Sequence, residues 1–296
     1  MPSLVILAAG MGSRYGGSKQ FSTFGPHDHL IIDYTVYDAI QTGFEKIVFV
    51  IRKEIEPAFN ESVLNKWKDK VDLRVVFQEL DSLPKSYKML EGRTKPWGTA
   101  HAVWMAEDEI NEPFAMANAD DFYGRSAIQK ACVHLHTMDE SSNDAFIVGY
   151  ELGNTLSPHG SVSRGLCKLN DYGNLLEIEE LKSIEASNGK IIAQKDGNEI
   201  ALRSNDLISM NLMGFTPAVF KTIREGFDQF YKDLTPGSNA EFYLANVLTK
   251  LLEEGAKVSV IPTDSRWFGV TYSEDNHWVN EQLRELHESG AYPDEL

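Results

Sequence analysis

The chain has 296 residues, of which 42% are hydrophobic and 24% charged, as is ordinary for a globular protein with a sizeable core. With 28 Lys and Arg against 44 Asp and Glu, the formal net charge is −16. This charge disfavours nucleic acid or an anionic membrane as a partner, because both repel an acidic surface. The two cysteines and the lack of an apolar run near the roughly 20 residues of a membrane span predict a soluble, cytoplasmic protein.

Short apolar runs alternate with amphipathic segments in the first half of the chain. This pattern predicts βαβ units on a mostly parallel sheet. The predicted strands are residues 3–8, 46–51, 71–78, 114–117 and 145–151, and the predicted helices are residues 30–42, 99–110 and 126–138.

The second half has the pattern of a β-rich segment followed by helices. Residues 165–169 and 175–179 predict a hairpin around a turn at 170–174, and Asp196-Gly197-Asn198 predicts a second turn. The further predicted elements are strands at 207–215 and 258–261, the latter stopped by Pro262, and helices near 218–231, 240–254 and 276–287. No linker separates the halves, so we expect a single domain, 1–296, with halves 1–151 and 152–296.

A glycine-rich segment from Leu7 to Lys19 follows the first predicted strand. Glycines let a phosphate come close to backbone N–H groups, because no Cβ is in the way. Arg14 and Lys19 add cationic donors for phosphate oxygens. The spacing is neither G-x-G-x-x-G, since Gly16 comes one position late, nor a P-loop, since a residue intervenes before Lys19. The plain alternative is a glycine-rich turn with two solvated cations.

Residues Leu7 to Arg14 match, position by position, the signature L-A-A-G-x-G-[ST]-R of the sugar-1-phosphate nucleotidyltransferases, also called NDP-sugar pyrophosphorylases. The chain resembles this NTP-transferase family, and Lys19 resembles its lysine on the nucleotide phosphates, although Ser18 replaces the usual proline. The resemblance implies an α/β fold of the Rossmann-like GT-A type, with a nucleotide-binding half and a β-rich sugar-binding half. It implies catalytic roles for Arg14 and Lys19. The loop positions that it implies in nucleotide binding are Leu7, Ala8, Ala9, Gly10, Gly12 and Ser13.

Four further positions extend the resemblance in the first half. Gln78 resembles the family's glutamine on the edge of the base, and Gly98 and Thr99 resemble the segment on which the base lies. Asp120, at the end of a predicted strand, resembles the catalytic aspartate that holds Mg²⁺, an ion that commonly takes one or two carboxylates. Asp121 is the weaker member of the pair. Alternatively, Gln78 is a surface residue, and the two Asp residues cap a helix.

Matches in the second half are looser. The resemblance implies that Gly165, Glu179, Lys182 and Asn211 bind the sugar phosphate, although Glu179 and Lys182 equally fit an exposed charge pair on a hairpin. The family commonly has W-x-D-x-G-T near its end, which supplies a second metal-ligating aspartate. Here the residues after Trp267 contain no aspartate at that position. The nearby candidates for its replacement are Asp264 and Asp275.

The implied reaction transfers a nucleoside monophosphate from an NTP to a sugar 1-phosphate, releasing pyrophosphate, with Mg²⁺ as cofactor and attack in line at the α-phosphorus. The glycine-rich loop disfavours a GT-A glycosyltransferase. Two alternatives stay open: a nucleotidyltransferase for a non-sugar phosphate, and a catalytically silent protein that binds a nucleotide or sugar nucleotide. The histidines and cysteines form no cluster with zinc-binding spacing, so we expect no structural metal. The base, the sugar and the oligomeric state are not predicted.

Overall fold

The computed structural model describes residues 2–10, 22–187, 189–195, 197–269 and 275–296. The first half contributes four neighbouring parallel strands. They are β1 (Ser3–Leu7), β4 (Lys46–Ile51), β5 (Asp72–Phe77) and β6 (Phe114–Asn118).

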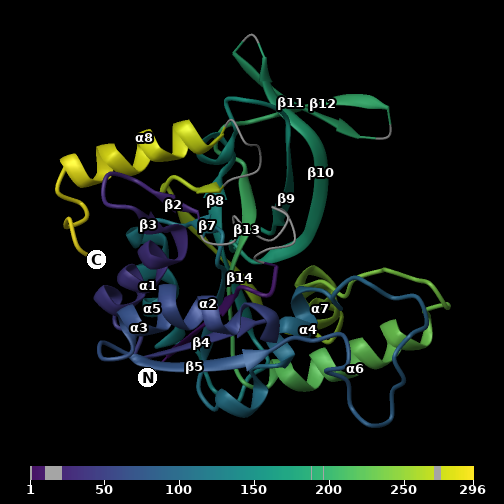
Figure 1. Ribbon diagram of the computed structural model, residues 1–296. Helices are drawn as coiled ribbons and strands as arrows, with labels where there is room; N and C mark the ends of the chain where they lie inside the picture. Colours follow the sequence, from purple (N-terminus) through teal and green to yellow (C-terminus); the bar gives the residue numbers. More distant parts are fainter. Residues whose placement is uncertain (1, 11–21, 188, 196, 270–274) are drawn as a thin grey trace.

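The second half adds antiparallel strands to the same sheet. They are β9 (Val162–Leu169), β10 (Leu175–Ser187), β11 (Lys190–Lys195), β12 (Asn198–Leu202) and β13 (Leu207–Phe215). The described strands follow the order β12-β11-β10-β9-β13-β6-β1-β4-β5 (Figure 1). β8 (Ala145–Glu151) also pairs with β13, and β14 (Val258–Thr263) pairs with β8. Because β13 pairs with β6, one continuous mixed sheet joins both halves of the chain.

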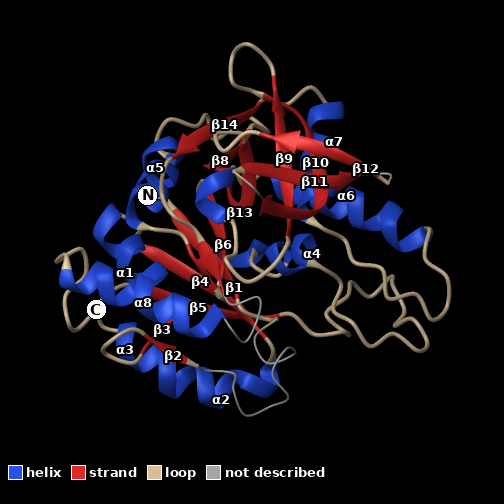
Figure 2. Cartoon of the chain, turned by 90° about the horizontal axis from the view of Figure 1, so that it is seen from above, coloured by secondary structure: helices blue, strands red, loops and turns tan. Residues whose placement is uncertain are grey.

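The central strands are buried on both faces, which explains their near-continuous apolar runs. In β1, Leu4 and Ile6 enter one core and Val5 enters the other. Figure 2 shows the helices on opposite sides of these strands. The first core contains residues of α1 (Ile31–Thr42), α5 (Arg125–Leu135) and α8 (Asp275–Glu288), and the second contains residues of α4 (Thr99–Trp104), α6 (Val219–Lys232) and α7 (Leu244–Glu253).

Several predicted boundaries are wrong. The strand expected over 175–179 runs on to Ser187, the helix expected over 126–138 ends at Leu135, and the helix expected over 240–254 begins at Leu244. The helix expected over 99–110 ends at Trp104, and a separate 3-10 turn, Glu107–Glu109, follows it. Pro262 does not stop β14, because it lies inside the strand opposite Gly149. A proline has no backbone N–H to donate, so it is tolerated in a strand that pairs on one side only. Among the described strands, β14 pairs with β8 alone.

The sequence analysis missed a helical segment at residues 53–67. It consists of a 3-10 turn (Lys53–Ile55), α2 (Glu56–Phe59), a π-helical turn (Asn60–Leu64) and α3 (Asn65–Trp67). Its buried side chains, Ile55, Phe59, Val63 and Trp67, recur at a spacing of four, so the helical signal is present in the sequence. Two short pairs were also missed: β2 (Thr23–Phe24) with β3 (His29–Leu30), and β7 (Asp121–Phe122) with β15 (Phe268–Gly269).

None of the described helices combines the length and the apolar character needed to cross a membrane.

Candidate active site

The order of the parallel strands reverses at β1. The chain passes from β1 to β4 and β5 on one side and then returns to β6 on the other. Since the four strands are parallel, their carboxyl ends meet at one edge, and open α/β sheets bind ligands where such a reversal occurs. Gly10 follows β1 at this edge, and Asp120 follows β6. The amide of Ala119 donates to the carbonyl of Leu7 at 3.1 Å, which joins the two strand ends.

The described part of the glycine-rich loop begins at this reversal. Leu7 ends β1, Ala8 and Ala9 are buried, and the amide of Ala8 donates to the carbonyl of Val50 at 2.8 Å. Within the described part of the chain, a Cβ added at Gly10 would meet no atom within 4 Å. The other predicted loop residues, Gly12, Ser13, Arg14 and Lys19, lie outside the described residues.

Gln78 lies at the end of β5, where its side chain is almost fully buried rather than a surface polar group. Its amide nitrogen donates to the carbonyl of Gly98 at 2.9 Å and approaches Nδ1 of His101 at 3.2 Å. Nε2 of His101 lies 2.8 Å from the carbonyl of Ser82, so Nε2 carries the ring proton and Nδ1 accepts. Burial lowers the pKa of His101 to about 4, which keeps the ring neutral. These bonds occupy the amide nitrogen of Gln78 and fix the orientation of its side chain.

Gly98 has a structural reason to be glycine. Its φ of 105° and ψ of 177° fall in a region that only glycine adopts readily. A Cβ there would lie 2.6 Å from the backbone nitrogen of Phe242. Thr99 joins the same contact, because its hydroxyl accepts the amide of Leu244 at 3.1 Å, at the start of α7. Gly98 and Thr99 therefore bind α4 to the segment before α7, beside Gln78.

A cavity of about 550 Å³ opens beside Asp120, toward the antiparallel part of the sheet. Its walls come from the end of β6, the first half of β9, the middle of β10 and β13, and Trp267. The lining residues that carry polar side chains are Asn118, Asp120, Asp121, Ser161, Ser163, Arg164, Glu180, Ser209, Asn211 and Trp267.

Asp120 and Asp121 differ in their surroundings. Asp120 is exposed at the cavity, whereas Asp121 is buried behind it. Asn118 and Tyr123 donate to Oδ2 of Asp121 at 2.9 and 3.2 Å. Burial raises the pKa of Asp121 above its ordinary value, and the charge of Asp120 raises it further. A cation beside this pair would reduce that repulsion, so the carboxylates fit a divalent ion with oxygen ligands.

The missing family aspartate has a structural counterpart. Gly269 stands at the position of that aspartate, and a Cβ added there would lie 2.8 Å from Oδ1 of Asp121. The Asp121 carboxylate therefore occupies the space that a side chain at position 269 would enter. Asp264 and Asp275, the two replacements suggested by the sequence, are not among the residues that line this cavity. Asp275 is buried and lies 3.2 Å from the hydroxyl of Ser157 instead.

Arg164 brings a buried positive charge to the cavity, which the sequence analysis did not predict. Its guanidinium donates to the carbonyls of Thr155 and Ser163 and lies 4.7 Å from the ring centre of Trp267. Burial lowers the pKa of Arg164 to about 10, while Asp121 and Glu180 act in the opposite direction, so the group remains a cation near neutral pH. The sequence does hold a signal for this residue, because Arg164 directly precedes Gly165, one of the predicted sugar-side residues.

Two of the four predicted sugar-side residues line the cavity. A Cβ at Gly165 would lie 2.8 Å from Cγ2 of Ile178, which also lines the cavity, so only glycine fits between these two strands without displacing Ile178. Asn211 has a φ of 60° at an irregularity in β13, a backbone conformation that asparagine tolerates and that directs its side chain toward the cavity lining.

The other two lie elsewhere. Glu179 contacts Lys168 at 2.9 Å and also Lys195, an ion-pair cluster that does not line the cavity. Lys182 is exposed and is also absent from the lining. Glu180, which directly follows Glu179 in β10, lines the cavity instead. Successive residues of a strand face opposite sides, so an error of one position exchanges a cavity residue for an outer one.

Comparison with known proteins agrees with this architecture. Residues 3–270 match the family model described as nucleotidyl transferase. The chain is 22% identical to the protein named UTP--glucose-1-phosphate uridylyltransferase AglF of Haloferax volcanii. The similarity extends over 286 residues, which cover 95% of this chain and 96% of AglF. It is 26% identical over 265 residues to the bifunctional protein GlmU of Staphylococcus carnosus, covering 88% of this chain but only 47% of GlmU.

Two solved structures share the fold. One is the inositol-1-phosphate CTP transferase from T. maritima, with a TM-score of 0.64, 17% identity and 97% of both chains covered. The other is a putative glucose-1-phosphate thymidylyltransferase from Bacillus anthracis, with a TM-score of 0.63, 15% identity and 96% of both chains covered. With the family model matching most of its length, and with a Rossmann-like sheet that ends in this cavity, the chain belongs to the nucleotidyl transferase family and is a nucleotidyltransferase.

Proposed function

We propose that this enzyme transfers a nucleoside monophosphate from an NTP to a sugar 1-phosphate and releases pyrophosphate. The observation that carries the proposal is the strand reversal at β1, where the glycine-rich turn and Asp120 leave neighbouring strands and a polar cavity opens beyond Asp120. The full-length similarity to a protein named as a UTP--glucose-1-phosphate uridylyltransferase supports a sugar phosphate as acceptor. We further propose that both halves act as one catalytic domain, since they share one sheet.

The proposed nucleotide side consists of the glycine-rich turn and the wall formed by Gln78 and Gly98. Backbone N–H groups of the turn, with Arg14 and Lys19, would bind the triphosphate. The amide nitrogen of Gln78 is held by Gly98 and His101, so its oxygen would accept a hydrogen bond from the edge of the base.

The proposed metal ligand is Asp120, with Asp121 as a second carboxylate behind it. The fit rests on one exposed and one buried carboxylate at a strand end, where burial, and then the charge of Asp120, raise the pKa of Asp121. Mg²⁺ suits this oxygen set and, when bound, supplies positive charge that reduces the repulsion between the two phosphorylated substrates.

The protein groups have mainly a positioning role in this chemistry. The attacking phosphate of a sugar 1-phosphate is largely ionised near neutral pH, so no side chain has to remove a proton. Arg164 would offset the acidic cavity wall, and Glu180 and Asn211 would accept and donate hydrogen bonds to sugar hydroxyls. Orientation and charge stabilisation of this kind can each contribute several kcal/mol to lowering the barrier.

The proposal is tested by measuring pyrophosphate release from the four common NTPs, each combined with a panel of sugar 1-phosphates in the presence of Mg²⁺. We expect one combination to turn over, and Asp120→Asn and Lys19→Ala to reduce its kcat by at least about 100-fold, in the range seen when one charge-stabilising group is removed. Asp171→Asn, at an exposed turn, is the control for the change in charge and should keep wild-type activity.

Two results would contradict the proposal. Turnover with inositol or choline phosphate but with no sugar 1-phosphate would identify an acceptor of another class. Nucleotide binding in calorimetry without turnover for any acceptor would identify a silent binding protein. Wild-type rates in the Asp120→Asn enzyme would remove Asp120 from the site.

A further inference from the structure

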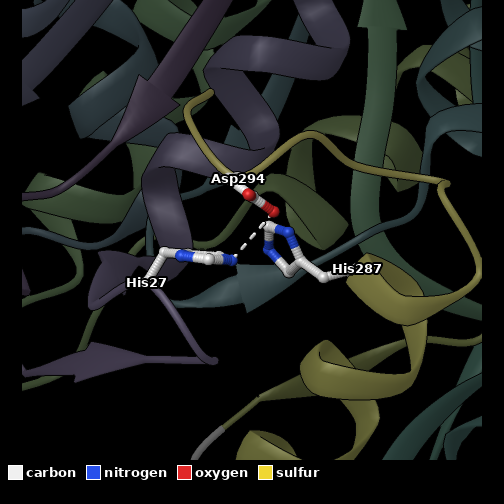
Figure 3. A group of neighbouring side chains, drawn as sticks. All are labelled: His27, His287 and Asp294. Atoms are coloured by element: carbon white, nitrogen blue, oxygen red, sulfur yellow. Dashed lines mark ion pairs between the residues drawn. The ribbon is translucent and has the colours of Figure 1, made fainter.

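Three side chains of metal-ligating types converge at a place outside the cavity lining. His27 lies in the turn between β2 and β3, His287 in the last turn of α8, and Asp294 in the segment after that helix (Figure 3). One ring nitrogen of each histidine and one carboxylate oxygen all lie within 4.8 Å of one another. His27 and Asp294 already form an ion pair, with Nε2 3.1 Å from Oδ1. The three side chains come from opposite ends of the chain, so the fold assembles this group.

We propose that His27, His287 and Asp294 form a binding site for a divalent transition-metal ion of the Zn²⁺ type. Two imidazoles and one carboxylate, with a water as the fourth ligand, are a common donor set for zinc. Bonds of 2.0–2.1 Å in a tetrahedron give neighbouring ligand atoms a separation of roughly 3.3 Å, and the His27–Asp294 separation of 3.1 Å is already close to it. Imidazole also favours Zn²⁺ over Mg²⁺ or Ca²⁺, which prefer oxygen ligands.

The surroundings of His287 support a ligand role. Its Nε2 lies 3.0 Å from the hydroxyl of Tyr34, a fully buried residue. Its Nδ1 is buried and makes no hydrogen bond of ordinary geometry with the described residues, although the Pro293 carbonyl lies close to the ring. This nitrogen is therefore the candidate ligand atom of the ring. A hydroxyl on the other nitrogen is the kind of outer contact that orients metal-binding histidines.

Asp294 is also positioned in advance. Its backbone carbonyl lies 3.0 Å from Nε2 of His29, whose Nδ1 lies 3.1 Å from Nζ of Lys66. These contacts hold residue 294 near β3 while its carboxylate faces His27. As an ion pair alone, this highly exposed carboxylate would add little stability. A bound ion would instead connect the β2–β3 turn, α8 and the C-terminal segment. This site is independent of the proposed reaction.

The test is calorimetric titration of chelator-treated protein with ZnCl₂, with millimolar Mg²⁺ present so that the carboxylates at Asp120 are occupied. We expect one Zn²⁺ per chain. His27→Gln and His287→Gln should each weaken binding by more than about 100-fold, since loss of an outer contact alone costs 10–100-fold. Tyr34→Phe should fall in that smaller range. His277→Gln, at an exposed position of α8 itself, is the matched control and should bind as wild type does.

A second readout uses Co²⁺ in place of Zn²⁺, because tetrahedral cobalt absorbs visible light and the absorption reports its ligands. We expect the band in the wild type and in His277→Gln, and its loss in His27→Gln, where an exposed side chain changes without disturbing the core. The proposal is overturned if the wild type binds no Zn²⁺, if His27→Gln keeps the wild-type affinity, or if His277→Gln loses as much as His27→Gln.

Discussion

At the scale of single residues, the second half of the site depends on which face of β10 each side chain takes. The sequence pattern marks an acidic residue near position 180 but cannot tell Glu179 from Glu180, because both fit a loosely matched strand. In the fold, Glu180 lines the cavity and Glu179 contacts Lys168 and Lys195 outside it. The choice is made by the register with which β10 pairs with β9.

These neighbours form a matched pair for mutation. Glu180→Gln should lower kcat/KM for the sugar 1-phosphate by about 10- to 100-fold, because a hydrogen bond involving a charged group contributes about 1.5–3 kcal/mol. Glu179→Gln removes the same charge from the same strand and should leave kcat/KM within about twofold of wild type, since the ion pairs that it breaks lie outside the cavity. Steady-state kinetics with the acceptor varied would measure both. Equal losses in the two variants would show that Glu180 has no special role.

At the scale of elements, the start of α4 depends on a contact that local sequence does not reveal. Gly98 was predicted as a glycine that makes room for a base. In the structure its missing Cβ makes room for the backbone of Phe242, whose carbonyl accepts the amide of Ala100 at 3.0 Å. This close approach to residue 242 by itself requires glycine at position 98.

Gly98→Ala should therefore destabilise the fold strongly. The substitution meets both an unfavourable backbone conformation and a collision with the Phe242 backbone, so we expect a loss of more than about 3 kcal/mol in the free energy of unfolding. Gly237→Ala is the control, because Gly237 also has a positive φ, of 80°, but a Cβ there would meet nothing within 4 Å. It should cost about 1 kcal/mol. Urea unfolding of both variants measures the difference, and similar losses would mean that the Phe242 contact yields easily.

At the scale of the whole molecule, the sheet separates two cores, and each core contains buried titratable groups. His101 is fully buried on the α4 side, and Asp38 is buried on the α1 side against Arg125 and Tyr292. Burial lowers the pKa of His101 to about 4 and raises that of Asp38 to about 6, with its bonds to Tyr292 and Arg125 opposing the rise. The two groups therefore make stability depend on pH in opposite directions.

For His101, the unfolded chain binds a proton below about pH 6.5, whereas the native ring does so only near pH 4. Its contribution should therefore reduce the free energy of unfolding by about 3 kcal/mol as the pH falls from 6.5 to 4. Asp38 acts oppositely, since stability is lost as the pH rises from 3.8 to about 6. Urea unfolding of the wild type and His101→Gln across this window should give a smaller acid loss in the variant. The exposed control, His136→Gln, should follow the wild type, and parallel curves for all three proteins would contradict the prediction.

The nucleotide half could largely be predicted from sequence, for a physical reason. A parallel strand is buried on both faces, so its apolar run marks its limits, and a glycine-rich turn directly after such a strand is necessarily at the carboxyl edge of the sheet. Among the parallel strands, β4 accordingly has its predicted bounds, and β1, β5 and β6 differ from theirs by no more than one residue at either end. The eight-residue match from Leu7 to Arg14 and the strand-end Asp120 identified the family from local sequence alone.

Tertiary structure decided what depends on contacts between distant segments. The register of β9 and β10 places Glu180 rather than Glu179 at the cavity. Packing places the Asp121 carboxylate beside Gly269, where the side chain of the missing family aspartate would lie. Packing also brings His27 to His287 across nearly the whole chain. Such pairs leave no periodicity or fixed spacing in the sequence, because the distance along the chain between two residues says nothing about their separation once the sheet and its helices have closed.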